Sequence, residues 1–377
     1  MHNLSKYCVL FIIGTRPEAI KLAPVILKFK ESNLFSVNIV LSGQHDEMVK
    51  SVMNIFGLQE DINFNLIKTV NSLEGIAAKI LEELNNYLIK VKPNMVFVQG
   101  DTITAFSGAL AAFFNKIPIA HVEAGLRTNN IYSPFPEEAN RRMISQISTI
   151  HFAPTQISFQ NLLNNGIIKN IHISGNTVVD AMSLVSNSKR GNLIDGIDIN
   201  TEEYILTTIH RRENWGKPLK NIAKGILNFA DKHKNIKLIL PLHKNPIVRK
   251  PIKEILGNHE NIFLVETLPY IDFILILKNS SIVLTDSGGV QEEAVTLGKP
   301  LLILRNSTER PEVFKGGNAS LVGTDPDKIE KELSSLLRDK KKYQKMAQKS
   351  KVFGDGDSSK IIFDKTLSFL QENLNLL

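Results

Sequence analysis

The sequence predicts an α/β fold of two domains, each a parallel β-sheet flanked by helices. The stretches 8–13 and 95–99 are almost wholly apolar, which is typical of strands buried on both faces of a parallel sheet. Amphipathic segments alternate with such stretches, and in residues 73–90 the apolar side chains recur at helical spacing. A polar segment at 187–200 interrupts the alternation, which then resumes, so the 377 residues are expected to form two domains.

The domain boundary is expected near residue 175, where a predicted strand ends and a crossover begins. The first domain would span residues 1–174 and the second residues 175–361. The remaining segment, about 362–377, carries apolar residues at helical spacing and is predicted to be a helix.

Composition limits the class of protein. With 43% hydrophobic and 22% charged residues, the chain has an ordinary soluble composition, and no apolar run approaches the roughly 20 residues that span a bilayer. The single cysteine, Cys8, argues against a disulfide framework and is compatible with the cytoplasm, where we expect the protein to work. No signal peptide is apparent.

The net charge of +7 raises the possibility of a nucleic-acid partner. However, the lysines are spread along the chain, and no nucleic-acid recognition motif accompanies them. A small polyanionic ligand is favoured instead, with no nucleic acid and no membrane insertion.

In the first domain, charged side chains follow the predicted strands. Arg16 and Lys21 lie in the loop and first helical turn after the first strand, where they are plausible phosphate or base contacts. Two later strands deliver Asp101 and Glu123 to the same sheet edge, and the loop before the next helix adds Glu137. Any one of these acids alone would more often be a cap or a salt-bridge partner. Three together favour acid and base roles.

In the second domain, residues 285–293 are the most distinctive stretch. An apolar run leads into a Ser-Gly-Gly turn at a helix start, whose free N–H groups suit an anion such as a diphosphate, with Glu293 able to take ribose hydroxyls. The plain alternative is a capped turn without a ligand. Trypsin-like proteases share Asp-Ser-Gly-Gly, but they are all-β and disulfide-bearing. Three more residues follow strands of the same sheet: His210, His243 and Arg310.

Metal and nicotinamide chemistry are not indicated. No His-Glu-x-x-His or similar ligand spacing occurs, and the glycine-rich turns do not match the dinucleotide fingerprint. We therefore expect no metal and no cofactor.

Six blocks in order resemble the bacterial non-hydrolysing UDP-N-acetylglucosamine 2-epimerases. The blocks are residues 14–18 (Gly-Thr-Arg-Pro-Glu), 99–102, 121–127, 136–141, 210–214 and 286–289. The resemblance implies two Rossmann-like domains of the GT-B type facing a central cleft, with the last helix packing back on the first domain. It also implies a homodimer that interconverts UDP-N-acetylglucosamine (UDP-GlcNAc) and UDP-N-acetylmannosamine (UDP-ManNAc). This reaction would supply a precursor for surface polysaccharide.

Matching positions imply roles for individual residues. The catalytic group implied is Asp101, Glu123, Glu137 and His210. Arg16 would contact the uracil together with backbone of residues 268–273, which include Tyr270 and Phe273. The diphosphate would lie against His210, Ser287, Gly288 and Gly289. Glu293 would bind the ribose and Arg310 the sugar or phosphates, with Lys21 and Arg141 in support.

Some members of that family bind a second UDP-GlcNAc as an activator. Gln44, Glu137, Arg211 and His243 match the positions associated with this effector. Glu47 stands where a glutamine is expected, and Val70 where an arginine is expected. Losing that arginine removes a bidentate anion contact, so activation stays an open question.

The chemistry implied is elimination of UDP to 2-acetamidoglucal followed by re-addition, and the sequence does not assign an acid to each face of C2. Four alternatives remain. These are a hydrolysing epimerase, a GT-B glycosyltransferase, an epimerase for UDP-sugars modified at C3 or C6, and a non-enzymatic UDP-sugar sensor, which would not need the acid cluster.

Overall fold

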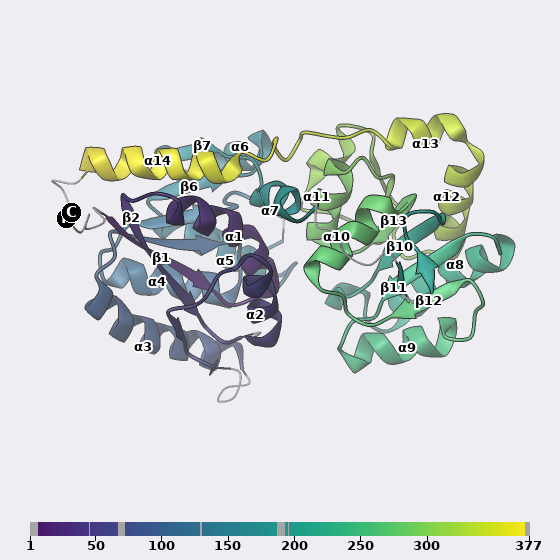
Figure 1. Cartoon of the computed structure of the whole chain (residues 1–377), viewed down its shortest axis with the longest axis horizontal. Helices are drawn as coiled ribbons and strands as arrows, with labels where there is room; N and C mark the ends of the chain where they lie inside the picture. The colour runs from purple at the N-terminus through teal and green to yellow at the C-terminus, as the bar shows by residue number, and fades with distance from the viewer. Residues whose placement is uncertain are drawn as a thin grey trace. The chain divides into compact units, whose positions relative to one another are not determined.

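A computed structural model describes residues 7–44, 46–66, 72–128, 130–186, 193–194 and 196–373. The chain divides into two compact units (Figure 1). The first unit comprises Met1–Leu184 with Phe353–Leu377, and the second comprises Val185–Val352. The predicted pair of parallel-sheet α/β domains is confirmed.

The first unit contains a seven-stranded parallel sheet of order β3-β2-β1-β4-β5-β6-β7. The chain builds outward from β1 in one direction and then continues from β4 in the other. Ligands of such sheets bind where the order reverses, at the carboxyl ends of the strands. The strands are β1 Tyr7–Ile13, β2 Phe35–Leu41, β3 Ile62–Asn63, β4 Met95–Gln99, β5 Ile119–Val122, β6 Ile150–Ala153 and β7 Ile171–Ile173.

Helices cover both faces of this sheet. Leu10 and Ile12 of β1 point into a buried cluster shared with helices α3, α4 and α5, whereas Phe11 stacks on Phe97 and meets Phe29 on the other side. The helices are α1 Arg16–Lys30, α2 Asp46–Ile55, α3 Leu73–Val91, α4 Ile103–Phe114, α5 Glu137–Ile147, α6 Gln156–Asn164, α7 Thr177–Val185 and α14 Ser358–Asn373.

The final helix, α14, packs against α1 (Figure 1, yellow). Phe363 meets the rings of Phe29 and Phe35 edge-on. The start of α14 is anchored by Asp180 of α7, which accepts hydrogen bonds from the backbone N–H groups of Ser358 and Ser359. Because of these contacts α7 stays with the first unit, so the expected boundary near residue 175 lies inside that unit. The predicted residues 374–377 of the last helix lie outside the described part.

The second unit repeats the same topology in a six-stranded parallel sheet of order β12-β11-β10-β13-β14-β15. A separate two-stranded antiparallel ribbon pairs β8 with β9. The strands are β8 Leu193–Ile194, β9 Ile197–Asp198, β10 Tyr204–Thr208, β11 Lys237–Pro241, β12 Ile262–Val265, β13 Ile282–Thr285, β14 Leu301–Ile303 and β15 Ala319–Leu321.

Helices α8, α9 and α12 line a buried hydrophobic cluster of the second unit. Gly225 lets α8 approach α12 closely, because a Cβ there would lie 2.9 Å from the carbonyl oxygen of Pro326. The helices are η2 Arg212–Asn214, α8 Lys217–Lys232, α9 Pro246–Leu256, α10 Tyr270–Asn279, α11 Gly288–Thr296, η3 Pro311–Phe314, α12 Pro326–Arg338 and α13 Lys340–Met346. Among the residues described, no helix combines the length and apolarity needed to cross a membrane.

Candidate active site

Glu123 follows β5 at the carboxyl edge of the first sheet, and its side chain is held by three other elements. Lys21 of α1 and Gln99 of β4 donate to its two carboxylate oxygens, and Asn176 donates to Oε1 over 3.2 Å. The residue is buried and adopts a left-handed conformation, φ +64°, which is uncommon for a side chain other than glycine. The carboxylate therefore has a fixed orientation and a partner for its charge.

Asp101 lies at the neighbouring strand end, after β4. Its Oδ2 accepts hydrogen bonds from both Nε and Nη2 of Arg141 in α5, each over 2.7 Å. Its backbone carbonyl accepts a bond of 2.8 Å from the side chain of Asn140. Asp101 keeps 22% of its side chain exposed, so the carboxylate is both held and accessible.

Glu137 is the first residue of α5. Its Oε2 is buried and has no hydrogen-bond partner within the described part of the chain. Buried carboxylate oxygens without partners are costly, and a catalytic role is one explanation for such an atom. This environment suits an atom that accepts a proton or a hydrogen bond from a substrate.

Glu18 ties two of the loops at this edge together. The carboxylate is fully buried and accepts bonds from the N–H groups of Gly14 and Thr15, at 3.0 and 2.6 Å, and from the hydroxyl of Thr102 at 2.6 Å. Burial raises the pKa of Glu18 to about 7 even though these bonds favour the ionised form. Thr102 is the residue after Asp101, so Glu18 fixes the turn that carries this acid.

His121 of β5 also contacts the turn that carries Asp101. It is fully buried, and its Nε2 lies 2.8 Å from the carbonyl oxygen of Gly100. Burial lowers the pKa of His121 to about 3, so the ring is neutral and donates from Nε2.

The remaining first-unit candidates lie around these acids. Arg16 is half-buried at the start of α1, and Gln44 accepts a 3.0 Å bond from the hydroxyl of Thr104 in α4. Glu47 is exposed in the first turn of α2. Val70 lies outside the described residues, so the structure does not describe that part of the predicted effector site.

Asp286 organises the equivalent edge of the second sheet. It is fully buried and accepts bonds from the backbone N–H groups of His210 and Arg211 and from the side chain of Asn214, at 2.9–3.0 Å. Burial opposes its ionisation, but attraction from His210 and these bonds outweigh it, so the pKa of Asp286 is lowered. Its Oδ1 also lies 3.1 Å from Nδ1 of His210, so the carboxylate can accept the Nδ1 proton and orients the ring.

His243 stacks beside His210, with ring centroids 6.1 Å apart. Burial and the nearby His210 lower the pKa of His243.

The predicted anion cradle lies at the start of α11. Ser287 caps the helix by accepting a bond from the N–H of Val290. A Cβ on Gly288 would lie 2.5 Å from Nη1 of Arg310 and 3.0 Å from Nη2 of Arg211, so two guanidinium groups flank the helix N-terminus. A helix N-terminus beside two arginines is a strong site for a phosphate group.

Acidic residues hold both arginines of this cradle in place. Glu309 forms an ion pair with Arg211 over 3.0 Å and a second one with Arg310. Glu292 accepts a hydrogen bond from Nε of Arg310. Gly289 has open space where a Cβ would lie. Ion pairs within the protein therefore hold the two arginines of the cradle in position.

The predicted ribose contact is also positioned by a neighbour. The hydroxyl of Tyr270 donates to Oε1 of Glu293 over 3.2 Å, and both residues are buried. Phe273 lies half-buried one turn along α10. Tyr270 thus orients Glu293, a role that the sequence did not suggest.

Comparison with known proteins identifies the family. A family model described as UDP-N-acetylglucosamine 2-epimerase matches residues 27–366. The chain belongs to this family. It is 42% identical to the UDP-N-acetylglucosamine 2-epimerase of Neisseria meningitidis over 367 residues, covering 95% of this chain and 99% of that one. The Escherichia coli K12 enzyme of the same name is 40% identical, with 94% and 97% covered.

A solved structure supports the same assignment. The crystal structure of the Neisseria meningitidis UDP-GlcNAc 2-epimerase bound to UDP-GlcNAc has a TM-score of 0.90 and 41% identity to this chain. It covers 96% of this chain and all of the other. The predicted resemblance to these epimerases is confirmed.

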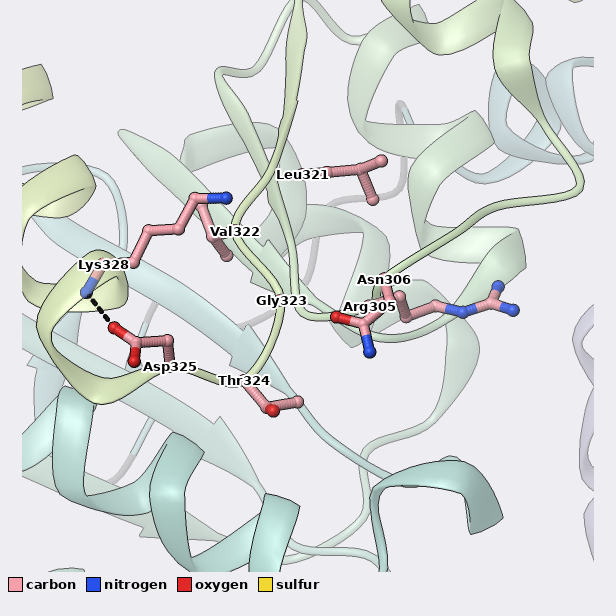
Figure 2. A pocket seen from close by; sticks show the side chains of 8 residues that line it. All are labelled: Arg305, Asn306, Leu321, Val322, Gly323, Thr324, Asp325 and Lys328. Carbon is pink, nitrogen blue, oxygen red and sulfur yellow. Dashed lines mark hydrogen bonds between the residues drawn. The ribbon is translucent and has the colours of Figure 1, made fainter.

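A pocket of about 310 Å³ in this epimerase-family chain lies away from the predicted residues (Figure 2). It is bounded by the ends of β14 and β15 and the start of α12, where Asp325 caps the helix by accepting from the N–H of Lys328. None of the predicted site residues lines it. The lining residues are Arg305, Asn306, Leu321, Val322, Gly323, Thr324, Asp325 and Lys328.

The structure brings the predicted residues of each unit into contact in pairs: Lys21 with Glu123, Arg141 with Asp101, and Arg310 with the turn at Gly288. The sequence alone did not identify the acidic residues that hold the predicted site residues and their loops in place. They are Glu18, Glu138, Asp286, Glu292 and Glu309. The pattern Thr-x-x-Glu at Thr15 is a capping-box signature and could have identified Glu18. The others have no local signal.

The pKa of Glu18 generates a prediction about stability. A folded-state pKa raised from 4.5 to about 7 favours the protonated form, so this group's stabilising contribution is complete below pH 4.5 and is lost as pH rises through 7. The loss amounts to about 3 kcal/mol. Glu18→Gln cannot titrate, so urea denaturation between pH 5 and 7.5 should show a flatter dependence than the natural chain. Glu31→Gln, an exposed acid at the other end of α1, should keep the natural slope. Equal slopes for all three proteins would contradict the assignment.

Gly288→Ala tests the anion cradle. The added Cβ forces the guanidinium of Arg310 to move, although Glu292 and Glu309 hold it. We expect UDP affinity, measured by calorimetry, to fall at least about tenfold, equivalent to about 1.4 kcal/mol. Thr296→Ala, in the last turn of the same helix, should leave the affinity unchanged. An unchanged UDP affinity in Gly288→Ala would mean that UDP does not bind there.

Proposed function

We propose that this protein catalyses the reversible epimerisation of UDP-GlcNAc to UDP-ManNAc at C2. The observation that carries the proposal is the set of oriented carboxylates, Asp101, Glu123 and Glu137, at one sheet edge of a chain from this family. A protein that only binds a UDP-sugar would not need them. The relative from Neisseria meningitidis, whose structure contains UDP-GlcNAc, supports the choice of substrate.

The chemistry follows from the substrate. The hydrogen at C2 is not next to a carbonyl group, so its direct removal is implausible. If the C1–O bond breaks first and its electrons leave with UDP, the oxocarbenium-like sugar makes that hydrogen acidic. A carboxylate then takes the proton, and a C1–C2 double bond gives 2-acetamidoglucal. Protonation of C2 on the opposite face and re-addition of UDP at C1 complete the inversion.

The acids of the first unit would act on the sugar. Carboxylates stabilise the positive charge that develops at C1 and shuttle the C2 proton. Lys21 and Arg141 keep Glu123 and Asp101 oriented for this work. Glu137 has a buried oxygen with no partner among the described residues and is suited to proton exchange.

The second unit would hold UDP. The N-terminus of α11, with Arg211, Arg310 and His210, stabilises the charge on the departing diphosphate. The same contacts must retain UDP while the glucal exists, because the nucleotide has to add back. Retention of UDP separates this reaction from a hydrolysing epimerase.

We further propose that the protein works as a cytoplasmic homodimer and supplies a precursor for surface polysaccharide. Apolar side chains exposed on adjacent helices support self-association: Phe113 and Phe114 at the end of α4 are 51% and 68% exposed, and Ile89 of α3 is 55% exposed. Such exposed apolar side chains favour burial against a partner.

Asp101→Asn tests the proton-transfer role. Asparagine keeps the shape of the side chain and an acceptor for Arg141, but it cannot take a proton. We expect kcat to fall about 10²–10⁴-fold while the Kd for UDP changes less than about threefold. Kinetics by proton NMR and calorimetry with UDP measure the two quantities. Comparable losses in both would assign Asp101 to binding or folding instead.

Product analysis separates the alternatives. Proton NMR of a reaction with UDP-GlcNAc should show UDP-ManNAc at equilibrium with substrate and no accumulation of free sugar. Release of N-acetylmannosamine and UDP would indicate a hydrolysing epimerase, and no reaction without an acceptor would indicate a transferase or a sensor. A panel of UDP-sugars modified at C3 or C6 would show which substituents the site accepts.

A further inference from the structure

We propose that Glu138 is a positioning residue of the reaction, which holds Arg141 and through it the carboxylate of Asp101 in the geometry required for proton transfer. The inference rests on the proposed role of Asp101. Glu138 follows Glu137 directly in the sequence, but the two side chains have different surroundings. Glu137 has a buried oxygen with no partner among the described residues, whereas both oxygens of Glu138 accept hydrogen bonds.

Glu138 lies in the first turn of α5 and is fully buried. Its Oε2 accepts hydrogen bonds from Nη1 of Arg141, at 3.1 Å, and from the N–H of Thr128, at 3.0 Å. Its Oε1 accepts from Nε of Arg142 at 2.8 Å. Both oxygens are therefore occupied by protein donors, so Glu138 is not available as the acid or base itself.

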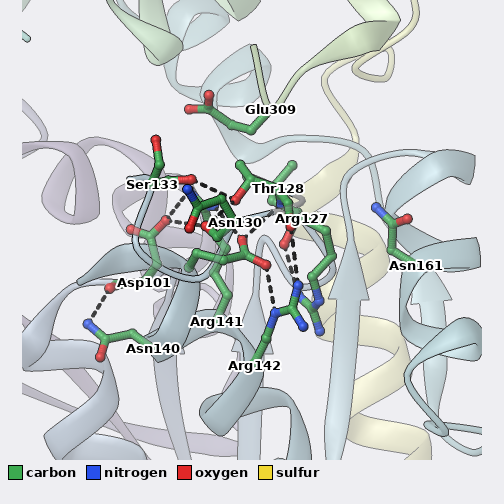
Figure 3. A network of polar contacts seen from close by, with 12 residues as sticks. Asp101, Arg127, Thr128, Asn130, Ser133, Asn140, Arg141, Arg142, Asn161 and Glu309 are labelled. Carbon is green, nitrogen blue, oxygen red and sulfur yellow. Dashed lines mark hydrogen bonds and ion pairs between the residues drawn. The ribbon is translucent and has the colours of Figure 1, made fainter. Parts of the chain in front are cut away.

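Arg141 connects Glu138 to the catalytic acid. Its Nη1 binds Glu138, while Nε and Nη2 both bind Oδ2 of Asp101. The guanidinium is planar and rigid, so the two carboxylates fix it from different sides. Arg141 is 5% exposed, and Figure 3 shows it beside Asp101 and Arg142. Loss of Glu138 would remove one of the two carboxylates that fix the guanidinium, so the orientation of the Asp101 carboxylate would be less restricted.

Charge gives a reason for a buried glutamate at this position. An arginine that paired only with Asp101 would follow the Asp101 carboxylate when that side chain moved, and so would not fix its position. A second, immobile carboxylate at the N-terminus of α5, where the helix dipole favours negative charge, gives the arginine a fixed reference point. Asn140 of the same helix holds the backbone of Asp101. Two consecutive residues of α5 thus set both the main chain and the side chain of the acid.

Glu138 also has a partner that does not serve Asp101 directly, which provides an internal control. Arg142 binds Glu138 through Nε and the carbonyl of Thr128 through Nη2, at 3.2 Å, and its side chain is 43% exposed. If the function of Glu138 is exerted through Arg141, removal of Arg142 should matter little.

A double-mutant cycle tests the proposal. Glu138→Gln is made in the natural chain and in Asp101→Asn, and kcat, KM for UDP-GlcNAc, Kd for UDP and Tm are measured for all four proteins. In the natural background we expect kcat to fall about 10²-fold, with KM and the UDP Kd within about threefold. In the Asp101→Asn background the same substitution should change kcat by less than about threefold, because the acid that it positions is already lost.

Two further variants complete the test. Arg142→Gln should keep kcat within about threefold of the natural value. Arg141→Lys retains the charge but not the fork, so it should reproduce the loss of kcat and should not be additive with Glu138→Gln. Arg141→Lys also keeps the proposal testable if Glu138→Gln fails to fold.

Four outcomes would overturn the proposal. Losses of kcat that multiply in the double mutant would show that Glu138 acts independently of Asp101. A fall in kcat that only follows the folded fraction, judged from Tm, would reduce Glu138 to a structural residue. Unchanged kcat in Glu138→Gln together with a collapse in Asp101→Asn would remove the positioning role and leave the proposed function intact. Full activity in Asp101→Asn would instead remove the role of Asp101, on which the inference rests.

Discussion

The buried ion pair between Lys21 and Glu123 is the contact on which the first unit's candidate site depends. A buried carboxylate is tolerated only when it is paired and hydrogen-bonded, and this one also receives bonds from Gln99 and Asn176. Four separate elements therefore meet at one charge. The need to pair a buried charge also applies to Arg141, which is paired with Asp101. In the second unit the buried Arg310 of the anion cradle is paired in the same way, with Glu309 and Glu292.

Topology determines where these charges meet. Each sheet reverses its strand order next to its own first strand, β1 or β10, and each places predicted site residues at carboxyl ends nearby. Asp101 and Glu123 follow β4 and β5, while Asp286 follows β13. Helix N-termini then complete each edge: α5 carries Glu137 and Glu138, and α11 carries Gly288. The same supersecondary arrangement thus gives an acid-rich edge in one unit and, in the other, a helix N-terminus flanked by two arginines.

The sequence predicted the features that local patterns determine. Apolar runs identified the buried strands, and the residues that follow them included Asp101, Glu123 and His210. Only the family resemblance separated Glu137 from Glu138, and nothing in the sequence indicated a role for Glu138. Its role depends on partners that are distant in sequence, such as Thr128. The fixing of Asp286 by residues near 210 and the hold of Tyr270 on Glu293 are likewise tertiary. The expected boundary near 175 missed the anchoring of α14 by Asp180 for the same reason.

In the proposed mechanism, the C2 proton leaves the sugar after UDP has departed, and a proton returns to the other face. Incubating the protein with UDP-GlcNAc in D₂O and observing C2 by proton NMR tests this most directly. We expect UDP-ManNAc to carry deuterium at C2 and recovered UDP-GlcNAc to acquire it as the reaction approaches equilibrium. UDP-ManNAc that retains the original hydrogen at C2 would contradict elimination and re-addition.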